Sequence, residues 1–285
     1  MAAIHDPRPS PPRLSEPQPT SAQPAEPVPL LPTLVSAVYK GGAWKTSIAV
    51  AIAELLAWLG LRVLLVSVDR QRDAMKRLGV DPNGRATSLP YGTGLITVTS
   101  CEGEDLALLI YDEGANAFGL LEHDVVVLDM PPEDQGGWLP GTFMVVPVAN
   151  QDCYENAAVM LGNTPHNTKV TLVRVNVDGN DPTRRTLKEK SEWRTQVKAL
   201  ELDLDRALGS LPDPVPRSQE IEKAHKNKKS IWLLPDDPNT DAFRQAIELL
   251  CRAFWKKDLW GAFPTMPTFT RPKKTVLPGW SRRRW

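Results

Sequence analysis

Cysteine and histidine are scarce in this 285-residue sequence, and neither is arranged for metal or redox chemistry. Cys101, Cys153 and Cys251 lie far apart, so the sequence contains no C-x-x-C pair. The four histidines are dispersed and lack the spacing of a metal site. A G-x-S-x-G nucleophile elbow is missing as well. These absences argue against zinc, thiol–disulfide and serine-hydrolase chemistry, and they predict three reduced cysteines that pack as small apolar residues.

Long hydrophobic runs are also missing. No apolar stretch reaches the roughly 18 residues that a bilayer-spanning helix needs, because Lys45, Glu54 and Arg62 interrupt the longest candidates. The first residues lack the basic start and the apolar run of about 7 to 15 residues that mark a secretory signal peptide. We therefore expect a cytoplasmic protein that does not cross a membrane.

Neither charge is in excess overall, since 34 Lys and Arg balance 34 Asp and Glu. The balance hides an asymmetry along the chain. Residues 252–285 carry a net charge of +8, residues 1–32 carry −1, and residues 33–251 carry −7. A basic tail on an acidic body predicts that the tail meets an anionic partner.

Proline is abundant, and its distribution divides the chain. Ten of the 27 prolines fall within residues 1–32, a stretch with little apolar content. Such a segment cannot bury enough surface to fold, so we expect a disordered Pro-rich N-terminal tail. Residues 33–258 are predicted to form one domain. Residues 259–285 are again rich in proline, are basic and contain tryptophan, which predicts a second tail.

From Thr33 onward, short apolar runs alternate with helical stretches. The runs are rich in Val, Leu and Ile without a polar alternation, as expected of strands that are buried on both faces. This pattern predicts an α/β fold, in which helices flank a mostly parallel, twisted sheet. Strands are predicted at 33–39, 62–68, 95–100, 124–129, 143–148 and 169–176. Helices are predicted at 46–59, 72–78, 104–112, 151–162, 183–200, 218–229 and 240–256.

The most informative segment joins the first predicted strand to the first predicted helix. Glycines let a backbone turn tightly and aim its N–H groups at phosphate oxygens, and the N-terminus of the next helix adds a partial positive charge. Lys45 is predicted to reach the β and γ phosphates of ATP, and the Thr46 hydroxyl to bind Mg²⁺. The sequence thus predicts a P-loop and a P-loop NTPase fold. The residues predicted to cradle the phosphates are Gly41, Gly42, Ala43, Trp44, Lys45, Thr46 and Ser47.

An ordinary P-loop has glycine before the lysine, and this one has Trp44. The segment from Lys40 to Ser47 resembles instead the deviant Walker A motif of the ParA/MinD family, K-G-G-x-x-K-[ST]. The resemblance covers roughly residues 33–250. It implies an ATPase in which Lys40 crosses a dimer interface to the partner's nucleotide and acts in catalysis together with Lys45. Many members of the family have glycine at the position of Trp44.

Two aspartates follow in the order that the resemblance implies. Asp69 ends an apolar run and precedes Gln71, similar to the D-x-Q of the family, so Asp69 is expected to position the attacking water. Asp129 ends the run HDVVVLD and resembles the Walker B aspartate, which holds Mg²⁺ opposite Thr46. The alternative for each aspartate is a simple residue at a strand end.

Two later segments resemble the parts of the family that contact adenine. Asn176 lies at the end of the run KVTLVRVNV, although asparagine is also a common turn former. Pro216 and Arg217 lie in LPDPVPRSQE, which is similar to the I-P-R segment of the family, and we expect them to border the base.

The resemblance also implies partners. ParA-like members form homodimers when they bind ATP, bind DNA nonspecifically, and move plasmids, chromosomes or other cargo with a ParB-like adaptor that stimulates hydrolysis. A nucleoid-associated protein is therefore expected. Ten basic residues resemble the places where ParA relatives contact DNA phosphates: Arg184, Arg185, Lys188, Lys190, Arg194, Lys198, Lys223, Lys226, Lys228 and Lys229. Acidic residues alternate with the first six, and the alternative for that stretch is an ordinary solvated helix face.

Two alternatives stay open. MinD-like members attach to membranes, and the last predicted helix, DAFRQAIELLCRAFWKKDLW, has a basic and aromatic end that could lie on a membrane surface instead of packing on the sheet. The other alternative is a scaffold that binds nucleotide without hydrolysing it, which the unusual Trp44 suggests.

Overall fold

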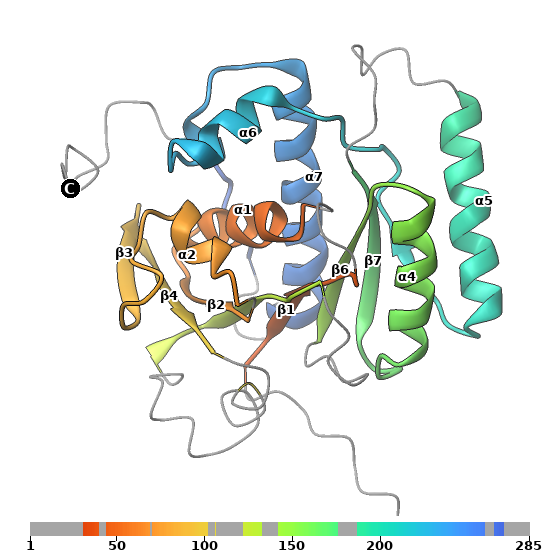
Figure 1. The fold of residues 1–285 in the computed structure, drawn as a ribbon, viewed down its shortest axis with the longest axis horizontal. Helices are drawn as coiled ribbons and strands as arrows, with labels where there is room; N and C mark the ends of the chain where they lie inside the picture. The colour runs from red at the N-terminus through yellow and green to blue at the C-terminus, as the bar shows by residue number, and fades with distance from the viewer. Residues whose placement is uncertain are drawn as a thin grey trace, which may run out of the picture.

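A mixed, mostly parallel sheet forms the middle layer of the domain (Figure 1). The computed structural model describes residues 31–39, 44–68, 70–101, 106, 122–132, 142–175, 187–259 and 265–270. Within these residues eight strands lie in the order β3-β4-β2-β5-β1-β6-β7-β8, and β3 alone pairs antiparallel, with β4. The predicted fold class is therefore confirmed. The strands are β1 (Thr33–Ser36), β2 (Arg62–Ser67), β3 (Thr87–Tyr91), β4 (Gly94–Ser100), β5 (Val125–Asp129), β6 (Phe143–Val148), β7 (Lys169–Arg174) and β8 (Gly209–Ser210).

Two of these strands were not predicted from the sequence. β3 has a mixed polar pattern and contains Pro90, which cannot donate a backbone hydrogen bond and is tolerated only at a sheet edge. β8 is only two residues long. Both lie at the edges of the sheet, where burial on two faces no longer demands an apolar run.

Helices cover both faces of the sheet. On one face, α1, α2, α6 and α7 share a hydrophobic core with the strands, and on the other face α4 and α5 do so (Figure 1). The helix predicted at 104–112 lies outside the described residues except for Leu106, which is buried. The α-helices are α1 (Lys45–Trp58), α2 (Asp73–Arg77), α4 (Gln151–Gly162), α5 (Leu187–Asp203), α6 (Gln219–Lys226) and α7 (Pro238–Phe254); η4 (Ile231–Leu233) precedes α7 and η5 (Trp255–Leu259) follows it.

The central helix α1 is buried on nearly all sides and contains one carboxyl group, Glu54. Tyr91 of β3 donates its hydroxyl to Oε1 of Glu54 (3.1 Å), and Ser230 donates to Oε2 (2.9 Å). Burial raises the pKa of Glu54 to about 7, although the two hydrogen bonds act in the opposite direction. Glu54 thus joins α1 to the edge hairpin and to the segment after α6.

This raised pKa predicts a pH-dependent contribution to stability. Glu54 releases its proton near pH 4.5 in the unfolded chain, whereas it keeps the proton until about pH 7 in the native protein. The contribution of Glu54 to the unfolding free energy therefore falls between these two pH values and is constant above them. We expect the unfolding free energy of the wild type, relative to Glu54→Gln, to fall by about 3 kcal/mol across the window. Denaturant unfolding of both proteins at several pH values measures this difference. A difference that does not change with pH would contradict the prediction.

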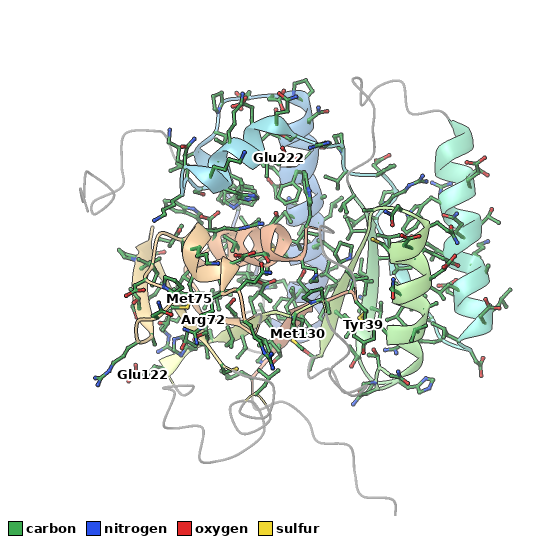
Figure 2. All side chains as sticks on the ribbon, in the orientation of Figure 1. Tyr39, Arg72, Met75, Glu122, Met130 and Glu222 are labelled. Carbon is green, nitrogen blue, oxygen red and sulfur yellow. The ribbon has the colours of Figure 1, made fainter. Side chains whose placement is uncertain are left out.

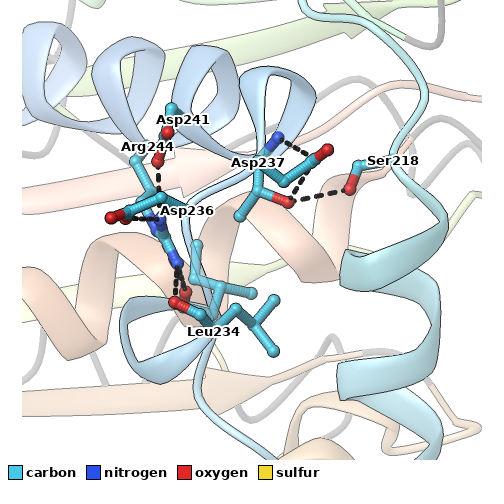
Figure 3. Close-up of polar contacts among 8 residues, drawn as sticks. Ser218, Leu234, Asp236, Asp237, Asp241 and Arg244 are labelled. Carbon is cyan, nitrogen blue, oxygen red and sulfur yellow. Dashed lines mark hydrogen bonds and ion pairs between the residues drawn. The ribbon is translucent and has the colours of Figure 1, made fainter. Parts of the chain in front are cut away.

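The start of α7 is fixed by a local network of polar contacts (Figure 3). The carboxylate of Asp237 accepts hydrogen bonds from the backbone N–H (2.9 Å) and the hydroxyl (3.0 Å) of Thr240, which caps the helix. The Thr240 hydroxyl also contacts Ser218, just before α6 (3.0 Å). Arg244 is buried, donates to backbone carbonyl groups of η4 and the residue after it, and pairs with Asp241 (2.6 Å). These contacts hold α6, η4 and α7 together as one unit.

The described part of the predicted C-terminal tail packs on the domain. Met266 and Phe269 contact the core on the α1 face, and the Phe269 ring meets Trp232 edge to face, with centroids 5.0 Å apart. Among the described helices, none is both long enough and apolar enough to cross a bilayer.

Candidate nucleotide-binding site

The carboxyl end of β1 leads into the segment before α1, at the centre of the sheet. Ser36, the last residue of β1, donates its hydroxyl to the backbone carbonyl of Lys45 (3.0 Å), so strand and helix are joined directly. In the first turn of α1, Lys45 and Ser47 are buried and Thr46 is partly exposed. Ligands of open α/β sheets bind at this edge, outside the carboxyl ends of the strands. β1 and α1 are thus placed as the strand and the helix that a phosphate-binding loop joins, and residues 40–43 between them lie outside the described residues.

Trp44 occupies a special place at the start of α1. Its backbone is left-handed (φ 63, ψ 17), and its carbonyl accepts the first helical hydrogen bond, from Ile48 (3.0 Å). Glycine adopts this conformation without cost, whereas for another residue the left-handed backbone costs about 1 kcal/mol of conformational free energy. The Trp44 ring packs edge to face on Phe243 of α7, with centroids 5.4 Å apart. An aromatic pair of this kind contributes about 1 kcal/mol, which offsets the cost of the left-handed backbone. The tryptophan is therefore accommodated by α7 at a position that suits glycine.

The start of α1 is suited to an anion. Within residues 44–58, the N-cap side chain makes no capping hydrogen bond and the first turn has no acidic residue. The N–H groups of a helix start need partners, and they carry the positive end of the helix dipole. A phosphate group satisfies both requirements.

Asp129 lies next to this helix start, at the carboxyl end of β5. The strand register places Asp129 beside Ser36 of β1 and beside Ser67 of β2. Asp129 is fully buried, and the adjacent backbone is held by hydrogen bonds from Met130 to Ser36 (3.2 Å) and from Val68 to Asp129 (3.0 Å). The two serines at the neighbouring strand ends were not recognised from the sequence. In the sequence, each is a small polar residue at the end of an apolar run, and that pattern could have identified them.

The residues at this edge fit Mg²⁺ by the chemistry of their donors. A hydroxyl on Thr46 and a carboxylate on Asp129 are the oxygen ligands that Mg²⁺ prefers. Within the described ranges, no group of three or more His, Cys, Asp or Glu side chains could enclose a metal by itself. Magnesium commonly binds through one or two protein oxygens together with substrate phosphates, so this arrangement suits a metal that arrives with a nucleotide.

One further residue at this edge was missed from the sequence. Arg77, the last residue of α2, donates from Nη1 to the Ser47 hydroxyl in the first turn of α1 (2.6 Å). The α2 helix lies beside α1. Figure 2 labels Arg72, which precedes α2, and Met75, which is buried within it. Arg72 holds the following loop through Pro82 (2.7 Å). No motif in the sequence points to Arg77.

Several predicted site residues lie outside the described residues. They are Lys40, Gly41, Gly42, Ala43, Asp69 and Asn176. Their roles stay predictions. Trp44, Lys45, Thr46, Ser47 and Asp129, by contrast, are brought together at one edge of the sheet.

Pro216 and Arg217, predicted to border the base, follow a segment that is tied to the end of β7. Val215 donates to the carbonyl of Arg174, the last residue of that strand (2.7 Å). Pro216 is buried, whereas Arg217 is exposed and pairs with Glu222 of α6 (2.9 Å). Both residues therefore lie near the carboxyl edge of the sheet, the edge at which α1 begins.

The basic residues predicted to contact DNA belong to two separate surfaces. α5 packs on one face of the sheet and exposes Arg194 and Lys198, while α6 packs on the other face (Figure 1). The other predicted basic residues near α5 have no described side chains. On and after α6 the exposed lysines are Lys223, Lys226, Lys228 and Lys229, which we call the α6 cluster.

The aromatic end of α7 is part of the core. Phe254 and Trp255 are 0% and 2% exposed, and Phe254 meets Phe143 of β6 edge to face. These are the residues on which the membrane-surface alternative depended. Both are buried in the core on this face of the sheet, so the helix packs as an ordinary core helix.

A cavity of about 610 Å³ lies elsewhere in the molecule. Leu55 of α1, Trp255 of η5 and residues 265–269 line it, together with charged residues of α7. Leu55 is ten residues beyond Lys45, or about 15 Å along the helix, so this cavity is separate from the start of α1.

Solved structures share this fold. The chain aligns with MinD in the MinC:MinD cell division complex of Aquifex aeolicus (16% identity, TM-score 0.52, 85% of this chain and 100% of that chain). It aligns with pNOB8 ParA bound to nonspecific DNA (13% identity, TM-score 0.52, 80% of this chain and 100% of that chain). It also aligns with a protein of Borrelia burgdorferi bound to AMPPNP, which is provisionally assigned to plasmid partition (16% identity, TM-score 0.51, 80% of this chain and 99% of that chain). No protein-family model and no curated protein matches the sequence.

These likenesses define the class of the fold. The chain has the P-loop NTPase fold of the ParA and MinD proteins, with an eight-stranded sheet and helices on both faces. The predicted resemblance to the ParA/MinD family is thus confirmed at the level of the fold. At 13 to 16% identity the likeness concerns architecture, and the chemistry of the site depends on the residues of this chain.

Proposed function

We propose that this protein is a ParA-type ATPase, which dimerises when it binds ATP and Mg²⁺ and binds DNA without sequence preference. The observation that carries the proposal is the junction of β1 and α1, where Lys45 and Thr46 in the first helical turn lie at the same sheet edge as the buried Asp129. The ATPase domain would span residues 33–258, between a Pro-rich tail at 1–32 and a basic tail at 259–285. Cargo positioning with a ParB-like adaptor is the biological role that follows.

Each residue of the site has a chemical task in this proposal. The backbone of residues 41–47 and the Lys45 ammonium bind the phosphates, and Thr46 and Asp129 hold Mg²⁺, which neutralises phosphate charge when it is bound. Lys40 from the partner stabilises the charge that develops during hydrolysis, and Asp69 orients the water. Asn176, Pro216 and Arg217 contact the base.

DNA binding is supported by charge and by a structural neighbour. The α6 cluster is exposed, and the chain from residue 252 onward carries a net charge of +8. One neighbour of the same fold, pNOB8 ParA, was solved on nonspecific DNA. A dimer would present two such surfaces to one duplex, which multiplies two weak contacts into one stronger contact.

The proposal predicts ATP-dependent and salt-sensitive binding to DNA of any sequence. We expect the protein with ATP and Mg²⁺ to bind a fluorescent random-sequence duplex, and to bind it much more weakly with ADP. Replacing Lys226, Lys228 and Lys229 by alanine should weaken binding and reduce the salt slope by up to about 0.9 for each lysine that contacts a phosphate. Fluorescence anisotropy over a range of salt concentrations measures both effects.

A matched control is Lys169→Ala. Lys169 is also exposed, but it lies at the amino end of β7 and is not part of the α6 cluster, so its loss should change neither affinity nor slope. A parallel pelleting assay with anionic liposomes separates the MinD-like alternative. ATP-loaded protein that ignores the duplex at low salt and pellets with liposomes would overturn the DNA-binding proposal.

A further inference from the structure

A partly buried cationic side chain reaches the candidate site from outside the predicted P-loop. Arg77 ends α2, is half-buried, and donates from Nη1 to the hydroxyl of Ser47 at 2.6 Å. Ser47 follows Thr46 in the first turn of α1, so the guanidinium group lies beside the N-terminal turn that is proposed to bind phosphate. A hydroxyl is a weak partner for a charge that has been removed from water.

The charges around Arg77 place it on the magnesium side of the site. Burial lowers the pKa of the Arg77 guanidinium, and the carboxylates of Asp129 and Asp73 act in the opposite direction. The group nevertheless stays charged, as arginine does in proteins. Asp129 is thus close enough to interact electrostatically with Arg77, and Asp129 is the proposed holder of Mg²⁺.

A histidine that interacts with Arg77 adds no positive charge of its own. His225 of α6 has its pKa lowered to about 3 by burial and by the charge of Arg77, so its imidazole is neutral at physiological pH. Arg77 therefore contributes a permanent positive charge beside Ser47 in the first turn of α1, and His225 does not add to it. Such a charge attracts an anion that carries several negative oxygens.

We propose that Arg77 is a nucleotide-binding residue that contacts the terminal phosphate of ATP from within the same chain. This inference rests on the proposed function and adds to it a residue that supplies specificity for the triphosphate. The planar guanidinium offers several N–H groups in a fork that matches phosphate oxygens, whereas Lys45 offers a single point charge. Because Arg77 belongs to α2, the presence of the terminal phosphate would also fix the position of that helix.

The test compares ATP with ADP in charge-changing variants. We would titrate wild type, Arg77→Gln, Arg77→Lys and the control Lys76→Gln with fluorescent ATP and ADP analogues in the presence of Mg²⁺. Arg77→Gln should lose about 10- to 100-fold in affinity for ATP and less than about threefold for ADP. Arg77→Lys keeps the charge but loses the fork, so it should recover only part of the ATP affinity and leave ADP affinity unchanged. Lys76 is exposed and pairs with Asp73, so its variant should bind both nucleotides as wild type does.

A merely structural role would give a different result. If Arg77→Gln loses ATP and ADP affinity equally, or loses neither, the inference is overturned and Arg77 only packs against α1. Thermal unfolding shows whether each variant is folded; should Arg77→Gln not fold, a selective loss for ATP in Arg77→Lys supports the inference and an equal loss overturns it. Wild type that binds neither nucleotide overturns the proposed function as well, which is a separate result from equal loss in a variant.

Discussion

Replacing Lys45 by alanine should abolish nucleotide binding, with a fall in ATP affinity of about 100-fold or more. Lys45 is buried in the first turn of α1, and its backbone carbonyl is held by Ser36 at the end of β1. The strand and the helix together therefore fix the position of the Lys45 charge. We expect no other side chain to supply that charge at the same place when Lys45 is removed. Isothermal titration with ATP and Mg²⁺ measures the change.

The matched control for this prediction is Lys76→Ala, which removes an exposed lysine from the neighbouring helix α2. It should bind ATP with nearly wild-type affinity. Because Lys45 packs in the interior, the melting temperature of each variant should be recorded as well. Wild-type ATP affinity in folded Lys45→Ala would show that the P-loop interpretation is wrong.

Replacing Asp129 by asparagine should reduce Mg²⁺-dependent ATP hydrolysis by about 100-fold or more. The amide keeps the size of the side chain but loses the charge that attracts Mg²⁺, and it leaves the nearby Arg77 without that carboxylate. Phosphate release with saturating duplex DNA measures the rate. ATP binding without Mg²⁺ should change much less, since Lys45 and the backbone N–H groups of α1 are untouched.

Asp124→Asn is the control on the same strand. Asp124 precedes β5 at its opposite end and forms a surface ion pair with Arg62 (2.8 Å). Its loss should leave hydrolysis within about twofold, since an exposed pair contributes little to stability. Full Mg²⁺-dependent hydrolysis by Asp129→Asn would remove Asp129 from the metal site.

The central part of the fold could be predicted from the sequence because burial on two faces leaves a strong local pattern. The apolar run that became β6 was predicted with its bounds, and the helix at 46–59 was predicted within one residue of α1 at each end. The same logic placed Asp129 at a strand end. The edge strand β3 escaped because an exposed, proline-containing strand carries no such pattern.

The contacts that could not be predicted join residues far apart in the chain. Arg77 and Ser47 are 30 residues apart, and Ser230 and Glu54 are 176 apart, so nothing in the local sequence announces either pair. The role of Trp44 was obscure for the same reason, because Phe243, which supports its ring, comes from the last helix. The sequence motif was enough to predict the loop before α1, and the contact with Phe243 explains why tryptophan is accommodated where the motif often has glycine.

The proposed nucleotide switch is tested most directly by the mass of the protein in solution. Sedimentation velocity should be run on the wild type with Mg²⁺ and a non-hydrolysable ATP analogue, with Mg²⁺ and ADP, and without nucleotide. We predict a dimer with the ATP analogue and a monomer in the other two samples, and a monomer throughout for Lys40→Ala, whose lysine is expected to reach the partner's nucleotide. A wild-type protein with the same mass in all three samples would contradict the account.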